Sequence, residues 1–241
     1  MKKNVLIILL TLLISNKMTA HYLWIETNNN GKLNEKQTIK VHYGEYTYGV
    51  IEKVNEDAFK KVKNFTLWII DPSGNKQKLT TKALENYYEA SYIPKLKGNY
   101  TVFLNNNKID VIDYTQYDFG IFKTHYHSTA NFNVGGVDNE NKTFNENGIV
   151  VKRISSSSDK IKLQVLYKNK PLVGNELKIF VSDLWSKTLE TDKDGMVLFS
   201  LPWKTKYIIE TTKKEEVPGN YNGKDYQFIW HCATYSIIHN K

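Results

Sequence analysis

The sequence predicts an all-β protein built from two immunoglobulin-like β-sandwich domains. Residues that favour strands are abundant, with 16 Tyr, 10 Phe and 5 Trp in a chain of 241 residues. Short runs of such residues recur along the chain, and clusters of Gly, Asn, Asp and Pro separate them, as is typical of a sandwich. The chain has one cysteine, Cys232, so buried apolar area rather than a disulfide framework must stabilise the fold.

The first twenty residues have the pattern of an export signal. A positive start at residues 1–3 precedes an apolar run at 5–14 and a polar stretch that ends in the small residue Ala20. The apolar run is too short to anchor the chain in a bilayer, which takes about 20 residues. We therefore expect residues 1–20 to be a signal peptide, and the mature protein to be a soluble periplasmic monomer that starts at His21.

The N-terminal domain is expected to span residues 21–145. Its strand-like runs lie at residues 22–25, 37–43, 65–70 and 100–104, and turn signals at 28–31, 71–75 and 97–99 separate them. The stretch from Glu52 to Lys63 is short and highly charged. It predicts a surface helix, or a loop over one end of the sandwich.

A polar stretch between residues 139 and 158 predicts the junction to a C-terminal domain, residues 146–241. Expected strands follow at residues 161–167, 177–181, 197–202, 207–211 and 226–238. The segment from Asp192 to Gly195 begins like a calcium-binding loop. It lacks the spaced ligands and the closing glutamate of such a loop, so we interpret it as a hairpin turn.

Two family resemblances follow from these motifs. The C-terminal series KPLVG, TDKDGMVLFSLP and YIIE, which begins at Lys170, resembles the seven-strand transthyretin-like or carboxypeptidase-regulatory-like module. The motifs HYLWIE from His21, YGE from Tyr43 and WHCATYS from Trp230 are similar to the DUF4198 family, periplasmic proteins related to the substrate-binding component of nickel and cobalt uptake systems. This resemblance implies a periplasmic β-rich protein that handles a transition metal, often beside a membrane metal transporter.

The resemblance covers most of the mature chain. It aligns His21 with the amino-terminal histidine of the DUF4198 family, and it matches Glu45 and His231 more loosely. Residues 105–145 depart from the family pattern, so the resemblance assigns no metal ligand there.

His21 is the strongest candidate metal ligand. Cleavage after Ala20 would leave it with a free α-amine, and the amine nitrogen and Nδ1 would close a six-membered ring on a metal ion. An α-amine, with a pKa of about 7.7–8.0, loses its proton more readily than a lysine. A divalent ion such as Cu²⁺ or Ni²⁺ would accept these two nitrogens and one or two further imidazoles. The alternative is that cleavage happens to fall before a histidine.

His125 and His127 are the next candidates. Residues two apart on a strand point to the same face, about 7 Å apart, so both imidazoles could reach one metal ion. The alternative is a pair of surface histidines in a polar segment. We expect the metal to be bound by His21, His125 and His127.

Three other residues complete the candidate set. His231 is the substitute ligand, although its neighbours in the last strand indicate a core histidine. Glu45 is expected to orient a ligand histidine through its second ring nitrogen, as carboxylates often do in metal sites. His42 lies in the second strand and is expected to face the end of the sandwich near Glu45.

Three classes of function remain open. The first is a metal-binding protein that supports nickel, cobalt or copper uptake or buffers the metal, and the resemblance favours it. The second is a histidine-brace copper enzyme that acts on polysaccharide, and the third is an adhesion or carbohydrate-binding sandwich. An ordinary hydrolase is not expected, because no phosphate-binding loop, nucleophile elbow or paired-carboxylate signature is present. The net charge of +8 comes from scattered lysines, so nucleic acid is not an expected partner.

Overall fold

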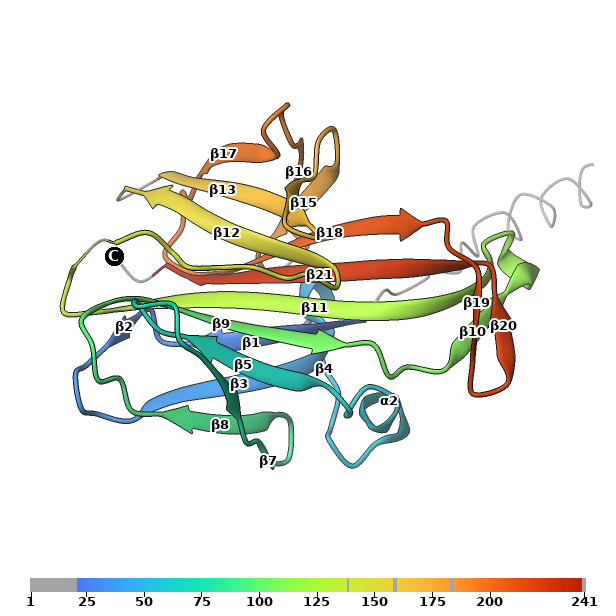
Figure 1. Cartoon of the computed structure of the whole chain (residues 1–241), viewed down its shortest axis with the longest axis horizontal. Helices are drawn as coiled ribbons and strands as arrows, with labels where there is room; N and C mark the ends of the chain where they lie inside the picture. Colours follow the sequence, from blue (N-terminus) through green and yellow to red (C-terminus); the bar gives the residue numbers. More distant parts are fainter. Residues whose placement is uncertain (1–20, 138, 158–159, 183, 240–241) are drawn as a thin grey trace, which may run out of the picture.

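The computed structural model describes residues 21–241 except 138, 158–159, 183 and 240–241. The expected signal peptide, residues 1–20, lies outside the described residues. Strands dominate the fold, which confirms the all-β prediction (Figure 1). In the described part of the chain we find one α-helix, α2 (Asp57–Lys60), and two 3-10 turns, η1 (Tyr46–Tyr48) and η2 (Thr115–Tyr117). None of these is long and apolar enough to cross a membrane.

A five-stranded antiparallel sheet covers one side of the N-terminal half. Its order is β1-β3-β8-β7, with β4 paired to β3. Its strands are β1 (Tyr22–Thr27), β3 (Gln37–Glu45), β4 (Val50–Ile51), β7 (Lys82–Ala83) and β8 (Tyr88–Tyr92). These strands form because apolar residues alternate along β1 and β3 and place Leu23, Ile25, Ile39 and Val41 on one buried face.

A ten-stranded sheet runs through the centre of the molecule. Its order is β16-β15-β18-β21-β11-β9-β5-β6, with β2 and β10 also paired to β11. The strands are β2 (Asn30–Gly31), β5 (Thr66–Ile70), β6 (Lys76–Leu79), β9 (Gly98–Asn106), β10 (Val111–Tyr114), β11 (Gly120–Val134), β15 (Glu176–Phe180), β16 (Ser186–Glu190), β18 (Lys206–Glu215) and β21 (Phe228–Ile238). Strands β11 and β21 are parallel, from the pair Phe122–Phe228 to the pair Ala130–Ser236. This pairing joins the two halves of the chain in one sheet.

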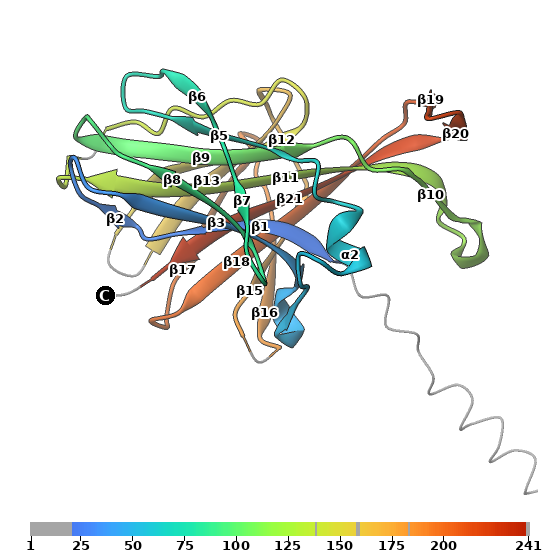
Figure 2. The same cartoon turned by 90° about the horizontal axis from the view of Figure 1, so that it is seen from below.

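A third sheet covers the C-terminal half. It contains β12 (Ile149–Ser156), β13 (Lys160–Tyr167), β14 (Lys170–Pro171) and β17 (Met196–Ser200). In Figure 1, β12, β13 and β17 lie above β11 and β21, whereas β3 and β8 lie below them. The hairpin of β19 (Gly219–Tyr221) and β20 (Lys224–Tyr226) lies beside β10 at one end of the molecule (Figures 1 and 2).

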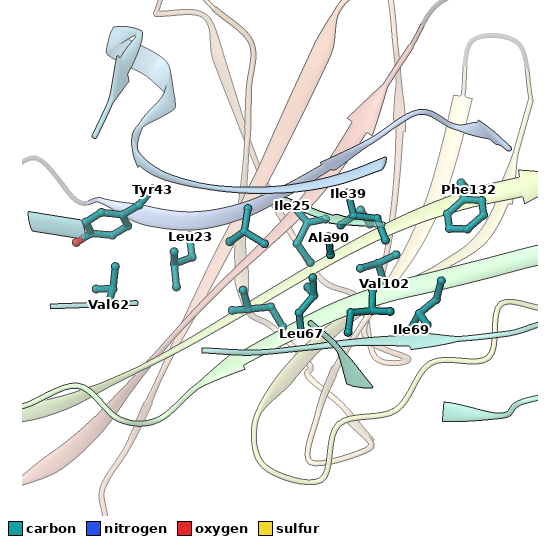
Figure 3. Packing of buried hydrophobic residues seen from close by; sticks show 14 of the residues in the cluster. Leu23, Ile25, Ile39, Tyr43, Val62, Leu67, Ile69, Ala90, Val102 and Phe132 are labelled. Carbon is teal, nitrogen blue, oxygen red and sulfur yellow. The ribbon is translucent and has the colours of Figure 1, made fainter. Parts of the chain in front are cut away.

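Each outer sheet packs a separate hydrophobic core on the central sheet. In the first core, Leu23 and Ile39 of the five-stranded sheet face Leu67 and Val102 of the central sheet (Figure 3). The second core lies under the third sheet and contains Val151, Leu163, Val197, Ile209 and Tyr235. Each fully buried aliphatic or aromatic side chain of this kind contributes about 1.5–3 kcal/mol relative to an exposed one.

Several local features differ from the sequence-based expectation. The polar stretch at residues 139–158 contains β12, whose Ile149, Val150 and Val151 are buried. Eight strands, including the two-residue β14, form the second sandwich in the described residues, in place of the expected seven. The charged segment 52–63 contains the short helix α2, which confirms the expected surface helix, but its Phe59 is buried in the core.

The turn at residues 192–195 is not the expected hairpin turn, because the strands on either side of it belong to different sheets: β16 pairs with β15, and β17 pairs with β13. The Asp192 carboxylate accepts hydrogen bonds from the backbone N–H groups of Asp194 and Met196, at 2.9 and 2.8 Å. Gly195 has a φ of 70°, a conformation that glycine adopts without steric cost. The acidic side chain is therefore used to close the turn.

Candidate metal and ligand site at His21

His21 is held by contacts on three sides. Its Nε2 lies 2.7 Å from Glu52 Oε1, the Tyr126 hydroxyl donates to its backbone carbonyl at 2.9 Å, and its ring packs 5.4 Å from the Tyr43 ring. Because Glu52 occupies Nε2, the nitrogen left for a metal is Nδ1. That nitrogen is the one that closes a six-membered chelate ring with an α-amine on the same residue.

The tight turn after β3 brings Glu52 to His21. Gly44 pairs with Ile51, and the Glu52 N–H donates to the Tyr43 carbonyl at 2.9 Å. A Cβ at Gly44, where φ is 151°, would overlap the Val50 carbonyl oxygen. Glycine at this position therefore allows β4 to fold back closely on β3 and to place a carboxylate beside the amino-terminal histidine.

Glu45 lies near His21 but does not make the expected hydrogen bond to a histidine. Burial raises the pKa of the Glu45 carboxyl, and the charge of His21 opposes that shift. Glu45 Oε2 is buried without a hydrogen-bond partner in the described part of the chain. The contact with a histidine ring nitrogen that we expected of Glu45 is made by Glu52 instead.

The structure does not bring His21 together with His125 and His127. Successive side chains of a strand point to opposite faces. Tyr126, which binds the His21 carbonyl, packs against the first core, so His125 and His127 face the other side, toward the C-terminal half. The central sheet therefore separates His21 from both of the histidines expected to share its metal.

His125 and His127 instead lie beside His231. The rings of His125 and His231 are 5.1 Å apart, and His127 Nε2 lies 2.9 Å from His231 Nδ1. Strand β21 runs parallel to β11 with His125 opposite His231, which explains the cluster. The same-face expectation for His125 and His127 is correct, and the third imidazole that they meet is His231.

Buried polar contacts occupy the nitrogens of His127. Asn105 and Asn145 form a reciprocal amide pair, in which Asn105 Oδ1 accepts from Asn145 Nδ2 at 2.9 Å. This orientation makes Asn105 Oδ1 the acceptor for His127 Nδ1, 2.6 Å away. His127 Nε2 is then the acceptor for His231 Nδ1–H. Burial lowers the pKa of His127 well below its usual value, which agrees with a neutral ring.

His231 continues this network to the protein surface. Its Nε2 lies 3.1 Å from Glu215 Oε2 and 3.4 Å from the Tyr167 hydroxyl, and Glu215 also pairs with Lys168. Within the described residues, no group of three or more His, Cys, Asp or Glu side chains is arranged to hold a metal ion. The contacts among the three clustered histidines link β11 of the N-terminal half to β21 of the C-terminal half.

His42 has a structural environment of its own. Its ring stacks on Trp24 with centroids 5.3 Å apart, and its Nε2 lies 3.8 Å from Glu26 Oε2. Burial lowers the pKa of His42 to about 4, although Glu26 opposes the shift. The carboxylate that His42 faces is Glu26, not the expected Glu45.

A cavity of about 1100 Å³ opens beside His21, where β1 crosses the central sheet. Aromatic residues form much of its lining, namely Tyr22, Tyr43, Tyr114, Phe119, Phe122, Tyr126, Tyr221 and Trp230. Lys61 and Lys108 also line it, and so do Glu176, Lys178 and Glu210. Burial, with a smaller contribution from Glu45, raises the pKa of Glu210 to about 8. The sequence does not predict this cavity, because its walls come from strands far apart in the chain.

The fold and this site define an all-β protein with a cavity beside its first described histidine. Residues 18–215 match the family described as domain of unknown function DUF4198, and the chain belongs to that family. A comparison with curated proteins finds no match.

Some solved structures are distantly similar. A DUF4785 family protein from Legionella pneumophila is 12% identical, with a TM-score of 0.32 over 93% of this chain and 57% of that chain. Salmonella alpha-2-macroglobulin reacted with methylamine is 11% identical, with a TM-score of 0.29 over 94% of this chain and 16% of that chain. A two-domain fibronectin type III segment from chicken tenascin is 9% identical, with a TM-score of 0.23 over 86% of this chain and 95% of that segment. Similarity at this level does not identify a function.

Proposed function

We propose that the protein is a periplasmic transition-metal-binding protein that uses His21, at a mature amino terminus, to bind nickel, cobalt or copper. It would deliver the metal to a membrane metal transporter or buffer it. The contact between His21 Nε2 and Glu52 Oε1 carries this proposal. A carboxylate on the far ring nitrogen is the usual partner of a metal-binding histidine, because it orients the ring and increases its basicity.

The surroundings of His21 supply a small number of donor atoms for a metal ion. The bond from Tyr126 to the His21 carbonyl holds the backbone, so the amine and Nδ1 need little reordering to chelate a metal ion. The unpartnered Oε2 of Glu45 offers a carboxylate oxygen nearby. Nitrogen donors suit Cu²⁺, Ni²⁺ and Co²⁺, and affinity for a given site generally rises in the order cobalt, nickel, copper.

The geometry favours a protein that binds the metal for uptake or buffering over a histidine-brace copper enzyme. A brace needs a second imidazole facing the amino-terminal histidine, and His125, His127 and His231 lie on the opposite face of the central sheet. The ring of His42 stacks on Trp24. A carbohydrate-binding sandwich would not need a metal at His21, so the two amino-terminal forms in the experiment below should then bind Cu²⁺ with equal affinity.

Calorimetry on two forms of the protein tests the proposal. One form begins at His21, and the other retains residues 17–20, which moves the α-amine four residues away from the imidazole. We expect the form that begins at His21 to bind one Cu²⁺ at least about tenfold more tightly, a difference of about 1.4 kcal/mol. Binding should weaken as the pH falls, because protons compete with the metal for the amine and the imidazole.

Two variants control this experiment. His21→Ala in the form that begins at residue 21 should lose the tight site, since the amine alone cannot close the chelate ring. The double variant His125→Ala/His127→Ala should keep it if the variant remains folded by circular dichroism. Equal Cu²⁺ affinity for the two amino-terminal forms would contradict the proposed role of His21.

A further inference from the structure

The donor atoms at His21 are too few to complete the coordination of Cu²⁺ or Ni²⁺. These ions take square-planar or tetragonal sites of nitrogen and oxygen donors, which need at least four donor atoms. His21 offers two nitrogens, and Glu45 offers one carboxylate oxygen nearby. Across the described residues, no set of three His, Cys, Asp or Glu side chains is arranged around a metal position. At least one coordination position, and two if Glu45 stays unbound, must be filled from outside the chain.

The cavity beside His21 is much larger than one or two open coordination positions on a metal ion require. Its volume is about 1100 Å³. A water molecule occupies about 30 Å³ of liquid, and pockets for small organic ligands measure about 300–1,000 Å³. The cavity has room for an organic molecule in addition to a metal ion.

The walls of the cavity suit a flat molecule. Phe119 packs edge-on against Trp230 with centroids 5.2 Å apart, and Tyr22 packs edge-on against Tyr126 at 6.5 Å. Phe119 and Trp230 are half-buried, so their rings remain accessible from the cavity. Aromatic rings stack with, or pack edge-on against, another planar ring more favourably than against an aliphatic group of equal size.

We propose that the cavity binds a small planar organic chelator, and that this chelator and His21 together hold the metal ion in a ternary complex. The inference rests on the proposed function, because it uses the amine and imidazole of His21 as two of the metal donors. The chelator would supply the two remaining donors and place its flat face against Phe119 and Trp230. The protein would then select a chelated metal over the hydrated ion.

Two copper complexes test this proposal. Each carries one bidentate nitrogen chelator, either the planar aromatic 2,2′-bipyridine or the aliphatic ethylenediamine, and leaves two positions open for His21. The form that begins at His21 should bind the bipyridine complex at least about tenfold more tightly than the ethylenediamine complex. Electron paramagnetic resonance should report four nitrogen donors on the bound copper.

Matched variants locate the effect. Trp230→Leu and, separately, Phe119→Leu should remove the preference for the bipyridine complex and leave the affinity for Cu²⁺ alone unchanged. Trp203→Leu is the control, since Trp203 is 44% exposed and lies outside the cavity lining. Thermal unfolding of each variant shows whether it remains folded.

The possible outcomes separate this inference from the proposed function. Equal affinity for the two copper complexes would overturn the ternary complex while the role of His21 stands. The ternary complex would also be overturned if the bipyridine complex bound the form with residues 17–20 as tightly as the form that begins at His21. A preference that survives in both Trp230→Leu and Phe119→Leu would also overturn it. The affinity for Cu²⁺ alone in the two amino-terminal forms tests the proposed function separately.

Discussion

At the scale of single residues, Glu52 determines which nitrogen of His21 is available. Replacing Glu52 by Ala removes the hydrogen bond to Nε2, so the ring loses its fixed orientation. Loss of such an outer partner typically costs about 10–100-fold in metal affinity, and we expect that loss for Cu²⁺ here. Calorimetry on the form that begins at His21 measures it.

The conservative variant Glu52→Gln is the matched control for this prediction. Its amide oxygen can still accept a hydrogen bond from Nε2–H, so it should lose less affinity than Glu52→Ala. Wild-type affinity in Glu52→Ala would show that the contact does not support metal binding.

Glu210 makes stability depend on pH in a defined direction. Burial and the nearby Glu45 raise its pKa from 4.5 to about 8. A raised carboxyl pKa means that the folded state holds the proton more tightly than the unfolded state. This contribution to stability is fully present below pH 4.5 and is lost as the pH rises through about 8.

The variant Glu210→Gln should therefore gain stability relative to wild type as the pH rises. Glutamine resembles the neutral acid and does not ionise, so the difference between the two proteins isolates this one group. We expect the difference in unfolding free energy to change by on the order of 4 kcal/mol between pH 5 and pH 9, in favour of the variant. Urea unfolding at both pH values measures it, and a difference independent of pH would contradict the assignment.

At the scale of elements, the sequence predicts strands that bury one apolar face and misses strands that do not. Strands β1, β3 and β13 alternate apolar and polar residues, and each lies close to its expected position. Strand β11 is the longest strand, yet it has no such alternation, because it is covered on both sides and pairs many of its polar groups. Asn131, for example, donates to Thr101 and accepts from the Tyr235 hydroxyl. These partners lie on distant strands, so the pattern becomes interpretable only in the fold.

The close contact between Gly148, just before β12, and His127 of β11 holds these two strands together. A Cβ at Gly148 would overlap the His127 ring, so the backbone before β12 lies directly on the imidazole. We expect Gly148→Ala to destabilise the protein by about 1–3 kcal/mol, since a buried ring in a hydrogen-bonded network cannot move aside. Chemical denaturation measures the loss.

A double-mutant cycle with His127→Ala separates this overlap from other effects of alanine. The smaller side chain at position 127 leaves room for the new methyl group, so Gly148→Ala should cost less in the His127→Ala background. Additive effects of the two changes would show that the imidazole is not the obstacle.

At the scale of the whole molecule, the sequence names His21 as a candidate metal ligand but does not predict which residues surround it. His21 was identified because it follows a leader pattern, which is a local signal. Glu52 reaches it through a turn that depends on Gly44, and Trp230 reaches the cavity through the pairing of β21 with β11. The expected grouping of His21 with His125 and His127 failed for the same reason, because it depends on which face of a central strand each residue occupies.

The continuous central sheet predicts that the two halves of the molecule unfold together. Strand β21 of the C-terminal half lies parallel to β11 over nine residue pairs, and the buried bond between His127 and His231 crosses the same boundary. Removing the C-terminal half would leave β11 as a long unpaired edge, which is prone to pair with other chains. We therefore expect a fragment of residues 21–145 to aggregate or stay unfolded.

In the intact chain, urea unfolding should give coincident transitions for the two halves. Fluorescence from Trp68 and from Trp185 reports them, each observed in a variant whose other tryptophans are replaced by Phe. Two separate transitions, or a soluble and cooperatively folded fragment 21–145, would show that the halves are independent domains that only share an edge.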